Sequence, residues 1–383
     1  MNKKYKNPVY LDHNATTRLD PEAAKAMKPY LEENFGNPSS QYSLGIKAKQ
    51  GIENARKEVA GLIGAHYEEV FFTSGGSESN NMVIKGVIDF KNPEKNHIIT
   101  SRIEHPAILN PALFLMELGV KVSFLPVDGS GRVDPDDVRK AVLPETVLIS
   151  VMLANNETGT IQPIREISGI ARENGISMHT DAAQAVGKIK VDVNELDVDF
   201  LSIAGHKFYG PKGIGALFIR SGQVITPLIH GAAQEGGRRA GTENTMLAAG
   251  LGAASTTAKA RLEDDIENIK ALRNHFQALL FEGIDGLVLN GHPDERLPNT
   301  LNVSVPGLEG GRILEGLDFI MASTGAACHD TSIRLSHVLA AMAVPPEIGM
   351  GALRFSLGRS NTRKEIEEAA QLIINKVKRM KNE

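Results

Sequence analysis

The strongest constraint on the fold is an alternation, between residues 69 and 220, of short apolar runs with longer amphipathic ones. The short runs contain many β-branched and aromatic residues and are bounded by Gly, Pro, Asn or Asp, which is typical of β-strands. Because the runs are nearly continuous in their hydrophobicity, they favour strands that are buried on both faces. Seven strands are therefore predicted, at 70–74, 97–101, 121–127, 146–153, 175–180, 199–205 and 215–220.

Helical patterns lie between most of these strands, at residues 106–118, 135–143 and 164–174. Strands and helices that alternate along a chain build a mostly parallel sheet with helices on each face. We therefore predict an α/β fold with a seven-stranded, mostly parallel sheet at its centre.

The pattern changes after Gly241, which indicates a second structural unit. A long Ala- and Leu-rich helix is predicted from residue 245 to about 281, and we expect it to bridge into that unit. Beyond it the sequence predicts a strand at 299–305 and helices at 311–317 and 363–380.

A chain of 383 residues is long enough for two or three domains of about 150 residues each. We predict a large domain of residues 16–260. We expect an extended piece within residues 1–15 to pack with residues 261–383 in a smaller α+β domain. These are called the large and the small part below.

Composition excludes several classes of function. The net charge of −4 argues against a nucleic-acid partner, which normally needs a basic face. The single cysteine, Cys328, cannot form an internal disulfide, and alone it cannot hold an iron–sulfur cluster or a structural zinc. With no signal peptide and no run of about 18 apolar residues, the sequence predicts a cytoplasmic enzyme that does not span a membrane and uses no metal.

A lysine follows the sixth predicted strand, in the segment AGHKFYGPKG at 204–213. Lys207 would leave the carboxyl end of that strand and face the crevice where α/β sheets bind ligands. One interpretation is a Schiff-base lysine, with the glycines and the proline shaping the backbone around it. The other is a surface turn with an incidental lysine, and the spacing alone gives the two equal weight.

The segment TSGGSESN at 73–80 runs from a strand into a helix. Free backbone N–H groups and the helix dipole favour a phosphate at such a point, and Ser77 could cap the helix and touch the phosphate. Taken alone, a simple capped helix is the slightly better interpretation.

Further polar residues follow other predicted strands. Asp181 could pair with a protonated pyridine nitrogen, and Gln184 could reach a hydroxyl on the same ring. His105 precedes a proline that biases it to an extended backbone, so its imidazole could stack on that ring. Most lone histidines are merely satisfied polar residues, but the joint placement of these residues at strand ends is stronger evidence than any one of them.

Cys328 lies in the segment ASTGAACHD at 322–330, which is rich in small residues. A thiol in such a loop is more typical of a reactive cysteine than of a structural one, although a buried inert cysteine is the alternative. The neighbouring His329 could help to hold the thiolate.

Ten motifs together resemble the cysteine desulfurases of the class-V aminotransferase group and their relatives, the selenocysteine lyases. The likeness covers nearly the whole chain and keeps the family order. The motifs are YLDHNATT (10–17), FGNPSS (35–40), FTSGGSESNN (72–81), EHPA (104–107), NNETG (155–159), HTDAAQAVGK (179–188), GHKFYGPKGIGALF (205–218), GTENT (241–245), LPNTLNVS (297–304) and ALRFSLGR (352–359).

The resemblance implies a pyridoxal-phosphate enzyme of fold type I, the aspartate-aminotransferase type. It decides in favour of the Schiff-base interpretation: Lys207 would bind the cofactor and then move the Cα proton. It implies that His105 stacks on the ring, that Asp181 pairs with the pyridine nitrogen, and that Gln184 pairs with the ring oxygen.

Other roles follow from the same resemblance. Gly76, Ser77 and His206 match the phosphate-binding positions, with Thr242 reaching the phosphate from the neighbouring subunit of a homodimer. Asn156 matches a residue beside cofactor and substrate. The substrate-binding set that the resemblance implies consists of Asn14, Asn156 and Arg354, with Arg354 as the clamp on the substrate carboxylate.

The implied reaction converts L-cysteine to L-alanine. Cys328 matches the sulfur-accepting cysteine and would carry the sulfur as a persulfide, which a separate acceptor protein must then receive. Two departures leave the substrate open: Ala204 stands where many desulfurases have a serine, and the segment from Gly325 to His329 resembles that of selenocysteine lyases. The alternatives are a selenocysteine lyase, an aminotransferase of the same fold, which would need no thiol, and a non-catalytic sulfur-handling protein.

Overall fold

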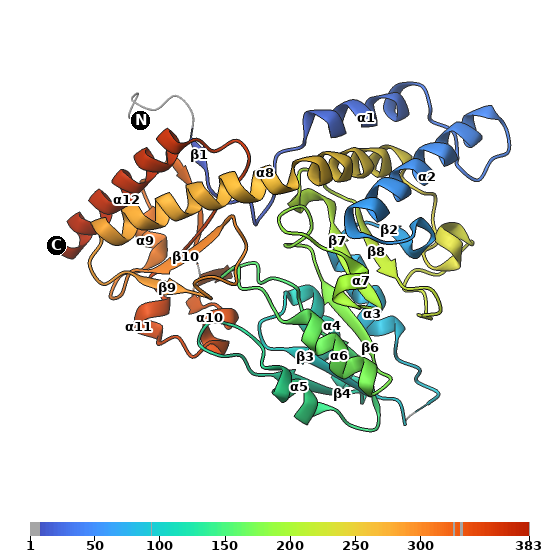
Figure 1. Ribbon diagram of the computed structural model, residues 1–383, viewed down its shortest axis with the longest axis horizontal. Coiled ribbons are helices and arrows are strands. Elements are labelled where there is room, and N and C mark those ends of the chain that lie inside the picture. Colours follow the sequence, from blue (N-terminus) through green and yellow to red (C-terminus); the bar gives the residue numbers. More distant parts are fainter. Residues whose placement is uncertain (1–7, 93, 325, 330–331, 383) are drawn as a thin grey trace.

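The computed structural model describes residues 8–92, 94–324, 326–329 and 332–382, with backbone only for 326–329 and 332–334 (Figure 1). Two bodies lie side by side in Figure 1, and one long helix, α8, runs across both of them. Both ends of the described chain lie in the smaller body.

The larger body is built on a seven-stranded sheet, as the sequence predicts. The strand order is β2-β8-β7-β6-β5-β3-β4, and β8 alone runs antiparallel to its two neighbours within this sheet. The strands are β2 (Val70–Thr73), β3 (His97–Ser101), β4 (Lys121–Leu125), β5 (Thr146–Ser150), β6 (Ser177–Asp181), β7 (Phe200–Ala204) and β8 (Gly215–Ile219).

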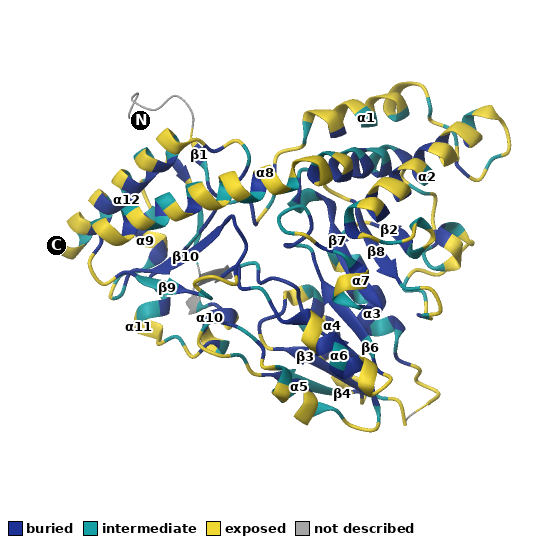
Figure 2. Ribbon diagram, viewed as in Figure 1, coloured by how far each residue is buried: buried dark blue, intermediate teal, exposed yellow. Residues whose placement is uncertain are grey.

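Both faces of this sheet are buried, because successive residues of a strand point to opposite sides. Ile98 and Phe200 belong to a core with helices α3 and α4, whereas Ile99 and Leu201 belong to a core with α2, α6 and the first half of α8. Figure 2 shows the buried residues gathered in the strands and on the helix faces toward them. The helices of this body are α1 (Pro21–Glu32), α2 (Ser43–Ile63), α3 (Gly76–Gly86), α4 (Pro106–Glu117), α5 (Pro135–Ala141), α6 (Ile164–Glu173) and α7 (Val193–Leu196), with 3₁₀ turns η1 (Tyr67–Glu69), η2 (Gly205–Lys207) and η3 (Gln234–Gly237).

Helix α8 (Thr245–Gly283) is 39 residues long and joins the two bodies. Ala248 and Leu251, near its start, pack into the core of the larger body. Phe276 and Leu280, near its end, pack into the core of the smaller one. The sequence predicts this bridging helix with nearly the same ends.

The smaller body centres on a four-stranded sheet of order β12-β15-β10-β9, in which each neighbouring pair is antiparallel. The extended N-terminal piece forms β1, which pairs in parallel with β11. The elements of the smaller body are β1 (Val9–Tyr10), β9 (Val288–Asn290), β10 (Thr300–Ser304), α9 (Gly310–Leu314), β11 (Ile320–Met321), β12 (Ser323–Thr324), β13 (Ala326–His329), β14 (Ser332–Leu335), α10 (His337–Ala341), α11 (Pro346–Gly349), β15 (Ala352–Ser356) and α12 (Arg363–Asn382).

The separate cores support the proposed division into a large part and a small part, whose boundaries at 15/16 and 260/261 stay a prediction. One core lies around β10, β15 and α12 and includes Val9 and Leu11 from the start of the chain. Across the described part of the chain, no helix carries an apolar stretch of the length needed to cross a lipid bilayer.

Candidate active site

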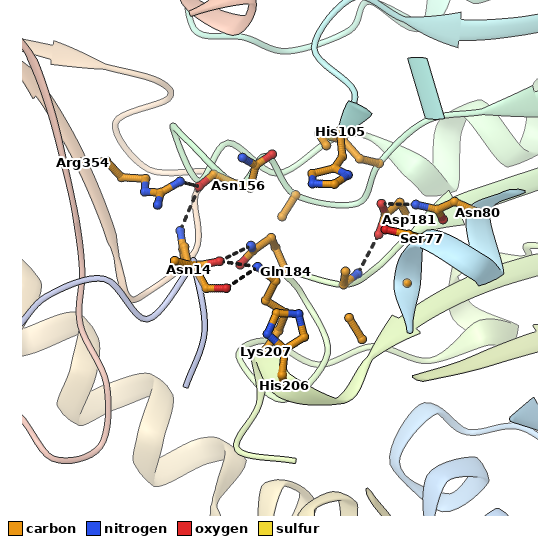
Figure 3. Close-up of a pocket in the computed structure, with 16 residues that line it drawn as sticks. Asn14, Ser77, Asn80, His105, Asn156, Asp181, Gln184, His206, Lys207 and Arg354 are labelled. Carbon is orange, nitrogen blue, oxygen red and sulfur yellow. Dashed lines mark hydrogen bonds between the residues drawn. The ribbon is translucent and has the colours of Figure 1, made fainter. Parts of the chain in front are cut away.

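A cavity of about 420 Å³ lies at the carboxyl ends of the large sheet's strands, where the two bodies meet (Figure 3). Its volume is within the usual range for small-molecule sites. Most of the predicted site residues line it, and they come from both parts of the chain. The lining residues are Asn14, Ala15, Gly76, Ser77, Asn80, His105, Met152, Ala154, Asn156, Asp181, Ala183, Gln184, Ala204, His206, Lys207 and Arg354.

One predicted residue does not line this cavity, and the side chain of another lies outside the described residues. Thr242 is exposed on the surface, and its assignment to the pocket of a neighbouring subunit stays a prediction. Cys328 belongs to β13, which pairs with β14 so that Cys328 lies opposite Ile333. The side chains of Cys328 and of Gly325 to His329 around it lie outside what the structure describes. The sequence predicts a loop here, whereas residues 326–329 form a strand that pairs with β14.

Lys207 ends the 3₁₀ turn η2, directly after β7. Its Nζ donates to the carbonyl oxygens of Asn14, over 2.6 Å, and Ala15, over 2.8 Å. Burial first, and then the Arg354 guanidinium, lower the pKa of Lys207 to about 8 against the opposing charges of Asp181 and Asp12. A lysine that lines the cavity with a lowered pKa is not an incidental surface lysine: a substantial fraction of its amine is uncharged and nucleophilic near neutral pH.

Asp181 ends β6, and its carboxylate is held in place from two sides. Asn80 Nδ2 donates to Oδ2 over 2.7 Å, and the backbone N–H of Ala183 donates to Oδ1 over 2.9 Å. The side chain is nearly buried, with 6% of its surface exposed. Asn80 was not predicted as a site residue; its position one helical turn after Gly76, facing the same strand end, is the signal that could have found it.

His105 caps the N-terminus of α4, and its Nδ1 accepts from the backbone N–H of Ala107 over 3.1 Å. This bond leaves Nε2 to carry the ring proton. The pKa of His105 is lowered, first by loss of water around the ring and also by Lys207, against the opposing effect of Asp181. The uncharged ring faces the cavity from the side opposite Lys207 (Figure 3).

The loop that carries His105 is anchored by a buried carboxyl group. Glu104 accepts from Ser101 Oγ over 2.5 Å and from the backbone N–H of Met152 over 3.0 Å. Complete burial raises the pKa of Glu104 to about 8. These contacts tie the end of β3 to the segment after β5, both of which line the cavity.

The N-terminus of α3 forms another wall. Gly76 starts this 11-residue helix, and an added Cβ there would lie 3.3 Å from the Cβ of Ala204, so the backbone approaches the end of β7 closely. His206 also lines this region, with Nδ1 3.1 Å from Thr16 Oγ1. Burial and the neighbouring lysines, Lys207 first, lower the pKa of His206 to about 4. The wall combines free helix N–H groups with a neutral imidazole, a set of donors suited to an anion.

Arg354 enters the cavity from β15 of the smaller body. Its Nη2 donates to Asp12 Oδ1 over 2.7 Å and to Ser323 Oγ over 2.9 Å, and its Nη1 donates to the carbonyl of Asn156 over 3.3 Å. The buried Nε has no hydrogen-bond partner among the described residues. Asp12, which was not predicted, belongs to the same YLDHNATT motif as Asn14.

Asn14 connects the two bodies. Its Nδ2 donates to the carbonyl of Asn156, over 3.1 Å, and to Thr300 Oγ1, over 2.8 Å. Its own carbonyl accepts from Lys207 and from Gln184 Nε2, the latter over 2.9 Å. The residue is buried, so it acts as a fixed junction between β10, the 155–159 segment and the lysine.

The fold and these residues define a pyridoxal-phosphate enzyme of fold type I. The chain belongs to the class-V aminotransferase family, whose pattern matches residues 9–369. It is 49% identical to a cysteine desulfurase IscS of Dictyoglomus turgidum, over 97% of this chain and 96% of that protein. It is 48% identical to a cysteine desulfurase IscS of Methanosarcina thermophila, over 98% and 93%. Among solved structures, a NifS-like protein superposes with a TM-score of 0.91 at 38% identity, over 97% of this chain and 99% of that one.

The residues present fit pyridoxal phosphate. The cofactor needs an amine for its aldehyde, an anion site for its phosphate, and a carboxylate for its pyridine nitrogen. Lys207, the start of α3 and Asp181 supply these groups around one cavity. The close approach of Gly76 to Ala204 leaves backbone rather than side chain at the anion site.

Proposed function

We propose that this protein is a cysteine desulfurase that converts L-cysteine to L-alanine and passes the sulfur to Cys328 as a persulfide. The observation that carries the proposal is that one cavity brings together the amine of Lys207, the carboxylate of Asp181 and the guanidinium of Arg354. In Figure 3, Asp181 and Arg354 lie at opposite sides of the cavity, with Lys207 between them.

The cofactor-side residues prepare the carbon chemistry. When bound, pyridoxal phosphate supplies an electron-withdrawing ring that stabilises negative charge on Cα of the amino acid. Asp181, held by Asn80 and the Ala183 N–H, is placed to keep a proton on the pyridine nitrogen. Lys207, with its lowered pKa, is suited to take the Cα proton as general base and to return one as general acid.

Arg354 is proposed to bind the substrate carboxylate. A guanidinium presents donors in a rigid fork that matches a carboxylate. Its Nε is unpartnered among the described residues, and Ser323 and the Asn156 carbonyl hold its plane. The substrate would therefore be fixed by a residue of the small part while its reacting carbon faces Lys207 of the large part.

The sulfur step uses Cys328. Its thiolate attacks the substrate sulfur, so that an S–S bond forms while the C–S bond breaks and its electron pair stays with the carbon, which gains a proton to become alanine. The balance is cysteine plus a thiol giving alanine plus a persulfide. Because Cys328 is the only cysteine, we propose that a separate acceptor protein receives the sulfur.

We also propose a cytoplasmic homodimer in which Thr242 completes the phosphate site of the neighbouring subunit. Large apolar side chains are exposed on and between α1 and α2: Leu31 is 70% exposed, Phe35 74% and Tyr42 61%. A cavity lies between α2 and the 232–243 segment and is lined by Glu243, the chain neighbour of Thr242. Exposed apolar side chains of this size in one region are typical of an interface.

The deciding experiment compares wild type with Cys328→Ala, each loaded with cofactor, and measures alanine formed from L-cysteine and from L-selenocysteine. We expect the variant to keep the cofactor absorbance and to lose turnover of cysteine. Undiminished alanine and sulfide release from cysteine by Cys328→Ala would overturn the persulfide route. Wild-type turnover confined to selenocysteine would instead identify a selenocysteine lyase, and keto-acid products without sulfide would identify an aminotransferase.

A further inference from the structure

A second lysine lies partly buried behind the site and has no part in the chemistry described above. Lys188 follows β6 in the same segment as Asp181 and Gln184. Its Nζ donates to Gln184 Oε1 over 2.6 Å and to Asn14 Oδ1 over 3.0 Å. Among the described residues, no carboxylate lies within ion-pair distance of it. A lysine whose only partners are two neutral carbonyl oxygens is unusual in a protein interior.

The two partners of Lys188 are both site residues. Gln184 Nε2 donates to the Asn14 carbonyl, which also accepts from Lys207. Asn14 in turn contacts the Asn156 carbonyl, to which Arg354 donates. Lys188 is therefore one hydrogen bond from Asn14, on which Lys207 rests, and two from Asn156, to which Arg354 donates.

The amide orientation of Gln184 follows from these contacts. The Asn14 carbonyl can only accept, so the atom that faces it must be Nε2, and Oε1 must then face Lys188. A carboxamide nitrogen has two N–H groups, and only one of them is used by Asn14. The other remains available to the cavity that Gln184 lines.

The number of donors on Lys188 matches its surroundings. Burial lowers the pKa of Lys188 well below its usual value, and Lys207 and Arg354 lower it further. An uncharged amine has two N–H groups, which is the number of acceptors that Gln184 and Asn14 offer. The side chain thus fits its site without a counter-ion.

We propose that Lys188 is a positioning residue that holds the Gln184 carboxamide with its free N–H toward the cofactor ring oxygen and holds Asn14 beneath Lys207. The inference rests on the proposed function, because it concerns how this site receives pyridoxal phosphate. Lys188 acts only through Gln184 and Asn14.

The test uses the cofactor-free full-length protein, titrated with pyridoxal phosphate and followed by cofactor absorbance. Lys188→Met keeps the length of the side chain but removes both donors, so that Gln184 Oε1 loses its partner while Asn14 Oδ1 keeps only its bond from Asn299. We expect its cofactor dissociation constant to rise about tenfold, the change that follows when a buried acceptor loses its partner. We also expect a shift in the pH at which the absorbance of the bound cofactor changes, since a hydrogen bond to the ring oxygen alters its electronic state.

A double-mutant cycle separates positioning from a general loss of packing. In a Gln184→Met background, the effect of Lys188→Met on the dissociation constant should shrink to about threefold or less, because only the contact with Asn14 is left for Lys188 to act through. Lys190→Met is the matched control, because Lys190 is exposed and pairs with Glu195. This variant should bind the cofactor as tightly as wild type does. Should Lys188→Met fail to fold, Lys188→Gln, which keeps an N–H donor, carries the same cycle.

Wild-type affinity and an unchanged absorbance profile in Lys188→Met would overturn the inference, as would an undiminished effect in the Gln184→Met background. These results are distinct from a failure of the proposed function. If wild type turns over cysteine while Lys188→Met is normal, the role of Lys188 alone is wrong. If wild type does not bind the cofactor at all, both proposals fail.

Discussion

The two sides of the cavity are built differently. The cofactor side consists of Gly76, Asp181, Gln184 and Lys207. These residues lie at or just after the ends of strands that belong to one sheet. The substrate side consists of Asn14 and Arg354, which come from opposite ends of the chain and both donate to the Asn156 carbonyl of the larger body. The comparison teaches that the cofactor side is set by the fold of a single sheet, whereas the substrate side depends on how two bodies are joined.

Lys207→Ala is the most severe way to break the cofactor side. Without its amine there is no general base, and we expect kcat on L-cysteine to fall by about 10⁴-fold, the upper range for such a group. On the substrate side the change removes one hydrogen bond to the Asn14 carbonyl, which keeps its bond from Gln184. Alanine production and cofactor absorbance check this, and turnover within tenfold of wild type would show that another group moves the proton.

Asp181→Asn keeps the shape of the cofactor side but removes its charge. The pyridine nitrogen would lose its stabilising partner, so we expect kcat to fall on the order of 10²-fold while the protein still binds cofactor. The asparagine Oδ1 can still accept from the Ala183 N–H, and its Nδ2 can donate to Asn80 Oδ1, which has no partner among the described residues, once the Asn80 amide turns over. Thermal unfolding should therefore change little. A variant with full activity would contradict the assigned role of the carboxylate.

Arg354→Gln breaks the substrate side and also tests how the two sides communicate. Loss of the charged fork should lower kcat/KM about 10- to 100-fold, mainly through KM, as expected for a charge-assisted hydrogen bond to the substrate. Cofactor affinity should stay close to that of wild type. An equal loss with L-cysteine and with an analogue lacking the carboxylate would refute the clamp.

The same variant should alter the pH dependence of cofactor uptake. The amine of Lys207 must be uncharged to react with the aldehyde, so in wild type the uptake rate should rise with pH and level off above about 8. Because Arg354 lowers the pKa of Lys207, its removal should move this midpoint to higher pH. Stopped-flow absorbance of the cofactor-free proteins measures both midpoints; identical midpoints would mean that the two sides are electrostatically independent.

Ala204→Ser should give the smallest effect. Ala204 lies beside Gly76 at the start of α3, where a hydroxyl could donate to the cofactor phosphate. One added hydrogen bond is worth about 1 kcal/mol, so cofactor affinity should rise several-fold. Weaker binding would show that the serine does not fit against the close backbone of α3.

Sequence reasoning succeeds where the pattern is local. The seven strands of the large sheet and the bridging helix are predicted because their apolar runs and flanking breakers lie within a few residues. Helix α2 was missed, and it contains three glycines that weaken a helical pattern. An added Cβ at Gly252 of α8 would lie 2.7 Å from the Cα of Ala55 in α2, so the two helices pack backbone to backbone there. At Gly51 it would collide with the Tyr30 hydroxyl, which would have to move.

The residues of the candidate site also divide into those with a local signal in the sequence and those without one. Asp181 and Lys207 could be found from their positions at strand ends, whereas the place of Arg354 came only from the family resemblance. Asn80, Asp12 and Lys188 were missed because their importance lies in contacts between distant segments. Nothing in the spacing of Asp12 and Arg354, 342 residues apart, signals their hydrogen bond.

The single helix that joins the two bodies fixes how the halves of the cavity are aligned. Each residue of an α-helix adds about 1.5 Å of length and about 100° of rotation. Deleting one residue of α8 between Ala258 and Phe276 would therefore turn the smaller body by more than a quarter of a circle and carry Arg354 away from Lys207. The number of residues in α8 therefore sets how the two halves of the cavity are aligned. Among related chains, α8 should tolerate substitutions far better than insertions or deletions.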